Sequence, residues 1–254
     1  MNLNGSADMK KEDKELIFDL LKKADSYVQG YTGNAFLNKP VFEDDIEVKA
    51  VAPVEAAAPA ATTSPAPGLT LDELNAKILR CTKCPLARTR NNVVPGEGVS
   101  NPEVLVIGEG PGYEEDMSGR PFVGKAGVLL DKMLNAIELD RKTNCFIANV
   151  VKCRPPENRD PEPSEQSACE GFLQAQIHIL KPKMILCMGR IAGHKMLDTT
   201  APLSEMRGSF HDYNGIPLMV TYHPSALLRD ESLKKPAWED LKAFKKKLNE
   251  LTGK

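Results

Sequence analysis

Short, predominantly apolar segments that alternate with helical segments constrain the fold of this chain more than any other feature. The apolar segments are EVLVIG (103–108), NCFIANVV (144–151) and KMILCM (183–188). Runs of this length without polar alternation are typical of strands that are buried on both faces. A helical segment follows each of them, at 124–139, 164–181 and 191–197. The alternation predicts an α/β fold with a mostly parallel sheet covered by helices on both sides.

The most unusual segments of the chain directly follow predicted strands. A further strand lies in residues 209–223, which also predict a hairpin with Asn214-Gly215 in a type I′ turn. In open parallel sheets, binding and catalytic groups lie at the carboxyl ends of the strands. The segments found there are GEGPG (108–112), NVVKCRPP (149–156), MGR (188–190) and YHPS (222–225). We therefore expect a functional site where these segments meet.

The N-terminal part of the chain differs in composition from the rest. Residues 50–68 are rich in alanine and proline, which predicts an extended linker and not a packed core. Residues 11–29 place apolar side chains along one helical stripe. We interpret residues 1–49 as an extension whose amphipathic helix either packs on its own domain or docks on a partner protein. The predicted globular domain is then residues 69–254.

Charge is divided unevenly along the chain. The formal net charge is -2 at pH 7, and residues 1–67 hold 7 Lys/Arg against 11 Asp/Glu, which leaves +2 for the remainder. A surface for nucleic acid would therefore be a local patch and not a field over the whole domain. No apolar run is long enough to cross a bilayer, and the N-terminus lacks the apolar core of a signal peptide. We expect a cytoplasmic protein.

The cysteines indicate a metal site. In a reducing compartment, six cysteines favour ligands or buried thiols over disulfides. Cys81 and Cys84 form a CxxC pair, Cys153 follows a strand end, and Cys169 lies in the next helix, so all four can face one loop region. The spacing favours a four-cysteine site, for zinc or for an iron–sulfur cluster, over a redox CxxC pair with two unrelated cysteines.

Four longer motifs extend the segments at the strand ends. They are GEGPGYEEDMSGRPFVGKAGVLL (108–130), NVVKCRPPENRDPEPSEQSAC (149–169), MGRIA (188–192) and YHPSALLR (222–229). Together they resemble family 4 uracil-DNA glycosylases over about residues 69–250. The resemblance implies a three-layer α/β/α sandwich around a parallel four-stranded sheet. It also implies hydrolysis of the bond between uracil and deoxyribose in DNA, and a structural 4Fe-4S cluster on Cys81, Cys84, Cys153 and Cys169.

The resemblance implies how a flipped uracil would be recognised. The base must leave the helical stack, and Leu227 or Leu228 would fill the vacated space while Arg229 contacts a phosphate. Phe122 would stack on the base. The amide of Asn149 would pair with uracil but leave the groups of cytosine mismatched.

The same motifs contain the groups expected to act in catalysis. His223 would donate a hydrogen bond to uracil O2, where negative charge develops in the transition state. Glu109 would shape the pocket or orient water, and Gly108 and Gly110 would present backbone N–H groups. Gly110 stands where the related family 1 enzymes have a water-activating aspartate, so we expect a dissociative reaction in which DNA phosphates stabilise the sugar cation. The acidic residues 114–116 are interpreted as a solvated turn.

Two other functions would explain parts of the pattern. A DNA-binding adaptor would recognise uracil without turnover, although it would not need Glu109, Phe122, Asn149 and His223 together. A zinc-bearing nucleotide-binding protein would be colourless, whereas an iron–sulfur protein is brown. For the leading hypothesis we expect a monomer, associated with the nucleoid and not with a membrane. It would bind uracil-containing DNA and recruit a repair or replication protein through its N-terminal helix.

Overall fold

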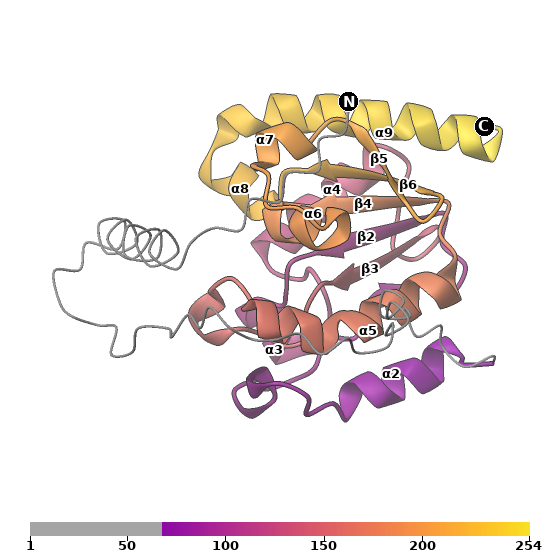
Figure 1. Ribbon diagram of the computed structural model, residues 1–254. Coiled ribbons are helices and arrows are strands. Elements are labelled where there is room, and N and C mark those ends of the chain that lie inside the picture. Colours follow the sequence, from indigo (N-terminus) through magenta and orange to yellow (C-terminus); the bar gives the residue numbers. More distant parts are fainter. Residues whose placement is uncertain (1–67) are drawn as a thin grey trace, which may run out of the picture. The chain divides into compact units, whose positions relative to one another are not determined.

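The computed structural model describes residues 68–254, which form a six-stranded sheet with strand order β1-β3-β2-β4-β6-β5 (Figure 1). The strands are β1 (Glu97–Gly98), β2 (Val104–Gly108), β3 (Cys145–Asn149), β4 (Met184–Met188), β5 (Phe210–Tyr213) and β6 (Ile216–Thr221). The four central strands β3, β2, β4 and β6 run parallel, whereas β1 and β5 pair antiparallel at the edges.

The predicted α/β class is confirmed, but the predicted count of four strands omits the two edge strands. β1 spans only two residues, too few to give a pattern in the sequence. β5 is the outer arm of the predicted hairpin and is half-exposed. Asn214 and Gly215 at its turn have φ values of 52° and 85°, and positive φ at both positions is what a type I′ turn requires.

Helices cover both faces of the sheet. They are α2 (Leu71–Leu79), α3 (Tyr113–Ser118), α4 (Lys125–Asn135), α5 (Pro163–Leu180), α6 (Arg190–Leu197), α7 (Leu203–Met206), α8 (Pro224–Arg229) and α9 (Lys234–Thr252), with 3-10 turns at Pro85–Arg88, Pro156–Asn158 and Glu231–Leu233. Figure 1 shows α5 on one side of the sheet, with α2 outside it, and α9 on the other side. The arrangement is the three-layer sandwich that the family resemblance implies.

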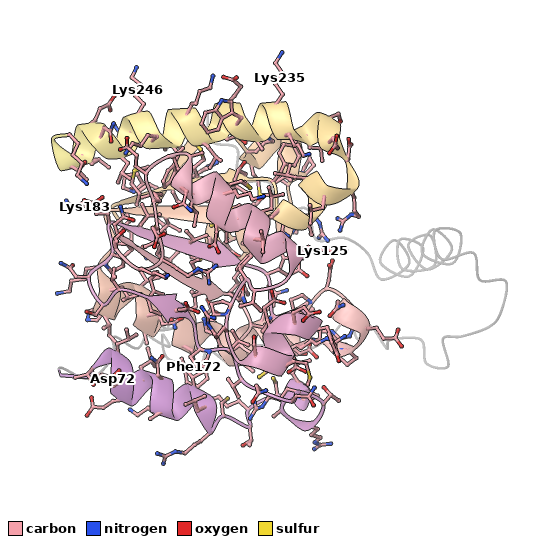
Figure 2. The ribbon with its side chains drawn as sticks, turned by 180° about the vertical axis from the view of Figure 1, so that it is seen from behind. Asp72, Lys125, Phe172, Lys183, Lys235 and Lys246 are labelled. Carbon is pink, nitrogen blue, oxygen red and sulfur yellow. The ribbon has the colours of Figure 1, made fainter. Side chains whose placement is uncertain are left out.

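The apolar runs are explained by a separate core on each face. Leu105 and Ile107 of β2 pack into the core beneath α5, while Val104 and Val106 pack into the core beneath α4 and α9. Both sets of side chains are excluded from water, so the strand has no polar alternation. The long helix α9 is amphipathic, and its outer lysines, such as Lys235 and Lys246, project away from the sheet (Figure 2).

The predicted N-terminal extension (1–49) and nearly all of the predicted linker (50–68) lie outside the described residues. Within residues 68–254, no helix is both long enough and apolar enough to cross a membrane.

Candidate active site and cysteine cavity

A cavity of about 600 Å³ opens at the carboxyl ends of the parallel strands. The parallel register brings distant segments together here, because Gly108 pairs with Asn149 and Met188 pairs with Thr221 at the strand ends. The loops that follow these strands form the walls of the cavity. Each segment singled out at a strand end in the sequence contributes residues to the lining.

The structure brings most of the predicted pocket residues together. Residues that line the cavity are Glu109, Gly110, Phe122, Asn149, His223 and Arg229. Gly108 lies beneath them, where a Cβ atom would be 2.4 Å from Asn149 Oδ1 and 2.6 Å from Phe122 Cζ. Glycine at this position therefore lets both side chains approach the strand end. The two predicted leucines differ in burial, since Leu227 is 3% exposed and Leu228 is 48% exposed.

Asn149 lines the cavity and carries a buried, unused acceptor atom. It is the last residue of β3 and is 2% exposed, and within the described residues its Oδ1 atom has no hydrogen-bond partner. A buried polar atom without a partner is unfavourable, and such atoms in native structures usually have a role. The side-chain amide of Asn149 is therefore a candidate for pairing with a ligand in the cavity.

Phe122 is held in an unusual backbone conformation. Its φ of 52° lies in the left-handed region, which residues other than glycine rarely adopt. The buried guanidinium of Arg141 donates to the carbonyl oxygens of Pro121 and Phe122, at 2.9 and 3.0 Å, and pairs with Asp131 at 2.7 Å. Sequence reasoning missed Arg141, because nothing near it in the chain points to the pocket.

The acidic segment 114–116 is not the solvated turn that we predicted. Glu115 accepts hydrogen bonds from the backbone N–H groups of Gly112, at 3.1 Å, and Val123, at 2.9 Å, and so joins the GEGPG turn to the Phe122 loop. Asp116 is 1% exposed and accepts from the backbone N–H of Asn91 at 2.9 Å. Only the tertiary structure shows which backbone N–H groups donate hydrogen bonds to these carboxylates.

His223 is a neutral hydrogen-bond donor. It precedes α8, and its Nδ1 atom accepts from the backbone N–H of Ser225 at 3.2 Å, which leaves the ring proton on Nε2. Burial, reinforced by the charge of Arg229, lowers the pKa of His223 to about 4. The ring lies 5.4 Å from the ring of Phe122, measured between centroids.

Glu109 is a carboxyl group with a perturbed pKa. Burial raises its pKa to about 7, the negative charge of Asp160 adds to the increase, and Arg190 opposes it. Arg190 and Asp160 form an ion pair and also line the cavity. Sequence reasoning gave neither residue a role, although a charged side chain at the end of a strand was a usable signal.

Four of the six cysteines line a second, small cavity next to α5. They are Cys81, Cys84, Cys153 and Cys169, and all are free thiols. The other two cysteines, Cys145 and Cys187, are buried within β3 and β4. The structure therefore separates the cysteines into the two groups that the sequence indicated.

The cysteine cavity has a lining that suits a soft, anionic metal centre. Its charged residues are all basic, namely Lys83, Arg90 and Lys152. Arg90 Nη1 donates to Cys153 Sγ at 3.1 Å, although burial still raises the pKa of this thiol to about 11. Within the described residues, no three His, Cys, Asp or Glu side chains are arranged to hold a single metal ion. Thiolates are the ligands of iron–sulfur clusters, so the donor set fits such a group.

Comparison with known proteins places the chain in a family. A sequence profile of the Uracil DNA glycosylase superfamily matches residues 95–242. The type-4 uracil-DNA glycosylase of Thermotoga maritima is 43% identical over 179 residues, which cover 69% of this chain and 93% of the relative. The enzyme of the same name from Saccharolobus solfataricus is 41% identical over 187 residues, covering 70% and 87%. A type-5 uracil-DNA glycosylase of Pyrobaculum aerophilum is more distant, at 27% over 190 residues, covering 61% and 83%. The chain therefore belongs to the type-4 family of the uracil-DNA glycosylase superfamily.

Proposed function

We propose that this protein excises uracil from DNA by hydrolysing the N-glycosidic bond, and so starts base excision repair by leaving an abasic site. The observation that carries the proposal is a cavity whose lining combines an aromatic ring, a neutral histidine and an amide whose buried oxygen has no partner among residues 68–254. Several relatives that match most of this chain are named type-4 uracil-DNA glycosylases. Because the glycosidic bond is hidden in a duplex, the base must be flipped into the cavity.

Asn149 would read the Watson–Crick edge of the flipped base. Its Oδ1 accepts from uracil N3–H, and its Nδ2 donates to uracil O4. Cytosine has no N3–H and carries a donor in place of O4, so both groups of the amide would face mismatched atoms. A mismatch of buried polar groups discriminates strongly between substrates. Phe122 would offer the face on which the base stacks.

His223 would stabilise the departing base. Negative charge builds on uracil O2 as the glycosidic bond breaks, and the Nε2–H group of a neutral imidazole can donate to that oxygen. A donor that is already oriented acts where charge develops, which is the effective form of electrostatic catalysis. The contact of Nδ1 with Ser225 holds the ring in the required tautomer.

Glu109 would orient the attacking water. With a pKa of about 7, the carboxyl group is partly ionised near neutral pH, and its ionised form can accept a proton from water. Gly110 offers no second base. We therefore propose a dissociative reaction, in which phosphates of the bound DNA stabilise the sugar cation. Gly108 and Gly110 would let the backbone approach the base closely.

Leu228 would fill the space left by the flipped base. It is the exposed member of the leucine pair, while Leu227 packs in the interior. The adjacent Arg229 lines the cavity and would contact a DNA phosphate.

Cys81, Cys84, Cys153 and Cys169 would hold a 4Fe-4S cluster that ties distant segments together. A single zinc ion would require the four sulfurs at about 2.3 Å from one point. No such group occurs among residues 68–254. A cluster spaces its thiolates more widely, because each thiolate binds a different iron atom. Glycosidic hydrolysis transfers no electrons, so the cluster would act in the structure and not in the reaction.

The remaining expectations form part of the same proposal. Residues 69–254 would be the glycosylase domain, joined by the linker 50–68 to an extension, 1–49, that recruits a repair or replication protein. The enzyme would act as a monomer near the nucleoid. Deletion of residues 1–67 should remove the partner from pull-downs and leave the glycosylase reaction intact.

A glycosylase assay tests the proposal directly. The substrate is a labelled oligonucleotide with one uracil, treated with alkali after incubation to cleave abasic sites. Matched oligonucleotides carry thymine or cytosine at the same position. We expect cleavage at uracil alone. Binding of uracil DNA without cleavage, by brown and cluster-loaded protein, would instead support the adaptor function.

A further inference from the structure

Lys152 is a buried lysine between the cysteine cavity and the proposed uracil pocket. The residue is 2% exposed and lies three positions after Asn149. A buried ammonium group is unfavourable unless it has hydrogen-bond partners and a counter-charge. The buried guanidinium of Arg141 has such a partner in Asp131. Among the described residues, however, no carboxylate pairs with Lys152.

The ammonium of Lys152 holds the strand end that carries Asn149. Its Nζ atom donates to the backbone carbonyl of Asn149 at 2.7 Å and to Gln176 Oε1 at 2.6 Å. Gln176 in turn donates through Nε2 to the carbonyl of Pro95 at 2.7 Å, which fixes the orientation of its amide. Both acceptors of the ammonium are neutral, so neither balances its charge.

The same residue forms part of the wall of the cysteine cavity. It lines that cavity together with the four thiols and directly precedes Cys153 in the chain. No acidic residue contributes to the lining. A 4Fe-4S cluster on four thiolates carries a net negative charge, and the charges around such a cluster tune its properties. The cluster would therefore be the missing counter-charge.

We propose that Lys152 is a positioning residue that couples the cysteine site to the uracil pocket. It balances the charge of the thiolate-bound cluster on one side and fixes the backbone of Asn149 on the other. The first half of the proposal rests on the proposed cluster, and the second half rests on the proposed glycosylase reaction. Through Lys152, the cluster would influence base recognition by Asn149, in addition to joining distant segments of the chain.

The test compares cluster-loaded wild-type protein with Lys152→Met. The first readout is the reduction potential of the cluster, measured without DNA. Removal of a buried positive charge should shift the potential to more negative values, because the more oxidised cluster is then relatively stabilised. The second readout is kcat/KM on uracil DNA, which should fall by about 10-fold or more, as for other outer-shell partners of metal sites.

Lys83→Met is the matched control. Lys83 lines the same cavity but is exposed, and its Nζ lies 4.8 Å from the ring of Phe172, which is labelled in Figure 2. Water and salt screen an exposed charge, so this variant should shift the potential much less. An equal shift in the two variants would overturn the specific role of Lys152.

Gln176→Glu keeps the test decisive if Lys152→Met fails to fold or to hold iron. The substitution has nearly the same shape and places a carboxylate next to the ammonium. It should also shift the potential to more negative values. An unchanged potential in either folded variant, or wild-type protein that never binds iron, would overturn the counter-charge role.

A shifted potential with unchanged kcat/KM would overturn the coupling to Asn149. If the wild-type protein does not cleave uracil DNA, affinity for that DNA replaces kcat/KM, so failure of the proposed function remains distinguishable.

Discussion

The proposed uracil pocket and the cysteine cavity share the segment 149–153, but they differ in how far protein groups alone hold their side chains in place. In the pocket, protein groups already hold the key side chains, since Arg141 fixes the Phe122 loop and Ser225 orients His223. In the cysteine cavity, burial raises the pKa of the Cys153 and Cys169 thiols, and among the described residues the charged side chains of the lining are all basic. The pocket is therefore preorganised by the sheet, whereas the cavity would depend on the proposed cluster. Substitutions in the pocket should affect catalysis alone, and substitutions in the cavity should affect stability and catalysis together.

The largest effect on catalysis is expected at His223. His223→Ala should lower kcat by about 10²–10³-fold, the range for loss of one donor at a developing anion. Thermal unfolding should be little changed. His178→Ala is the control, because His178 is exposed on α5. A fall in the unfolding temperature that matches the loss of activity would contradict the separation of the two regions.

Loss of a cluster ligand should reduce stability and activity together. Cys153→Ser should abolish the brown absorption and lower the free energy of unfolding by about 2–5 kcal/mol, the scale for loss of a cross-link between distant segments. Iron content and thermal unfolding measure the effect. Cys145→Ala, in β3, should retain its iron. Retention of full iron by Cys153→Ser would exclude this residue as a ligand.

Substitution of the two adjacent leucines should have different effects, one on activity and the other on stability. Leu228→Ala should lower kcat/KM on duplex DNA by about tenfold with stability unchanged, because an exposed wedge acts only when a base is flipped. Leu227→Ala should reduce the free energy of unfolding by about 2–5 kcal/mol through a cavity in the core. Activity assays and chemical denaturation of both variants measure the contrast, and the reverse pattern would assign the wedge to Leu227.

The pH dependence of kcat/KM should report Glu109. Its pKa is raised to about 7, so the ionised form that orients water increases as the pH rises through 7. Between pH 6 and pH 8 we expect a rise of about tenfold, set by the ionised fraction. His223, with a pKa of about 4, is neutral throughout this range and adds no second step. Glu109→Gln should be slower and should show a flat profile. Persistence of the step in that variant would assign it to another group.

The smallest effect is expected for the residue that holds Phe122. Arg141→Met removes two hydrogen bonds to the carbonyl oxygens of the Phe122 loop, each contributing about 1 kcal/mol. We expect KM for uracil DNA to rise by about threefold to tenfold, with a smaller change in kcat. Steady-state kinetics measure the effect, and Lys142→Met is the exposed neighbour used as a control. A loss confined to kcat would show that Arg141 does not act through base binding.

The sequence by itself determined the fold class, the four cysteines that line one cavity and the segments that line the other. Each of these depends on a local pattern. Apolar runs such as VLVIG indicate strands buried on both faces, and the carboxyl ends of parallel strands necessarily meet at one edge of the sheet. The sequence motifs were specific enough to indicate the family before any contact was known.

Only the tertiary structure decided which side chains are buried and which groups they bind. Leu227 and Leu228 are identical in type and adjacent in the chain, and the packing of α8 alone distinguishes them. The sequence pattern predicted a solvated turn for Glu115, yet this side chain accepts hydrogen bonds from backbone donors of two loops. Lys152 lies between two sites that no local pattern connects. Burial and hydrogen-bond partners depend on residues far away in the chain, so they follow from the assembled fold and not from the pattern around each residue.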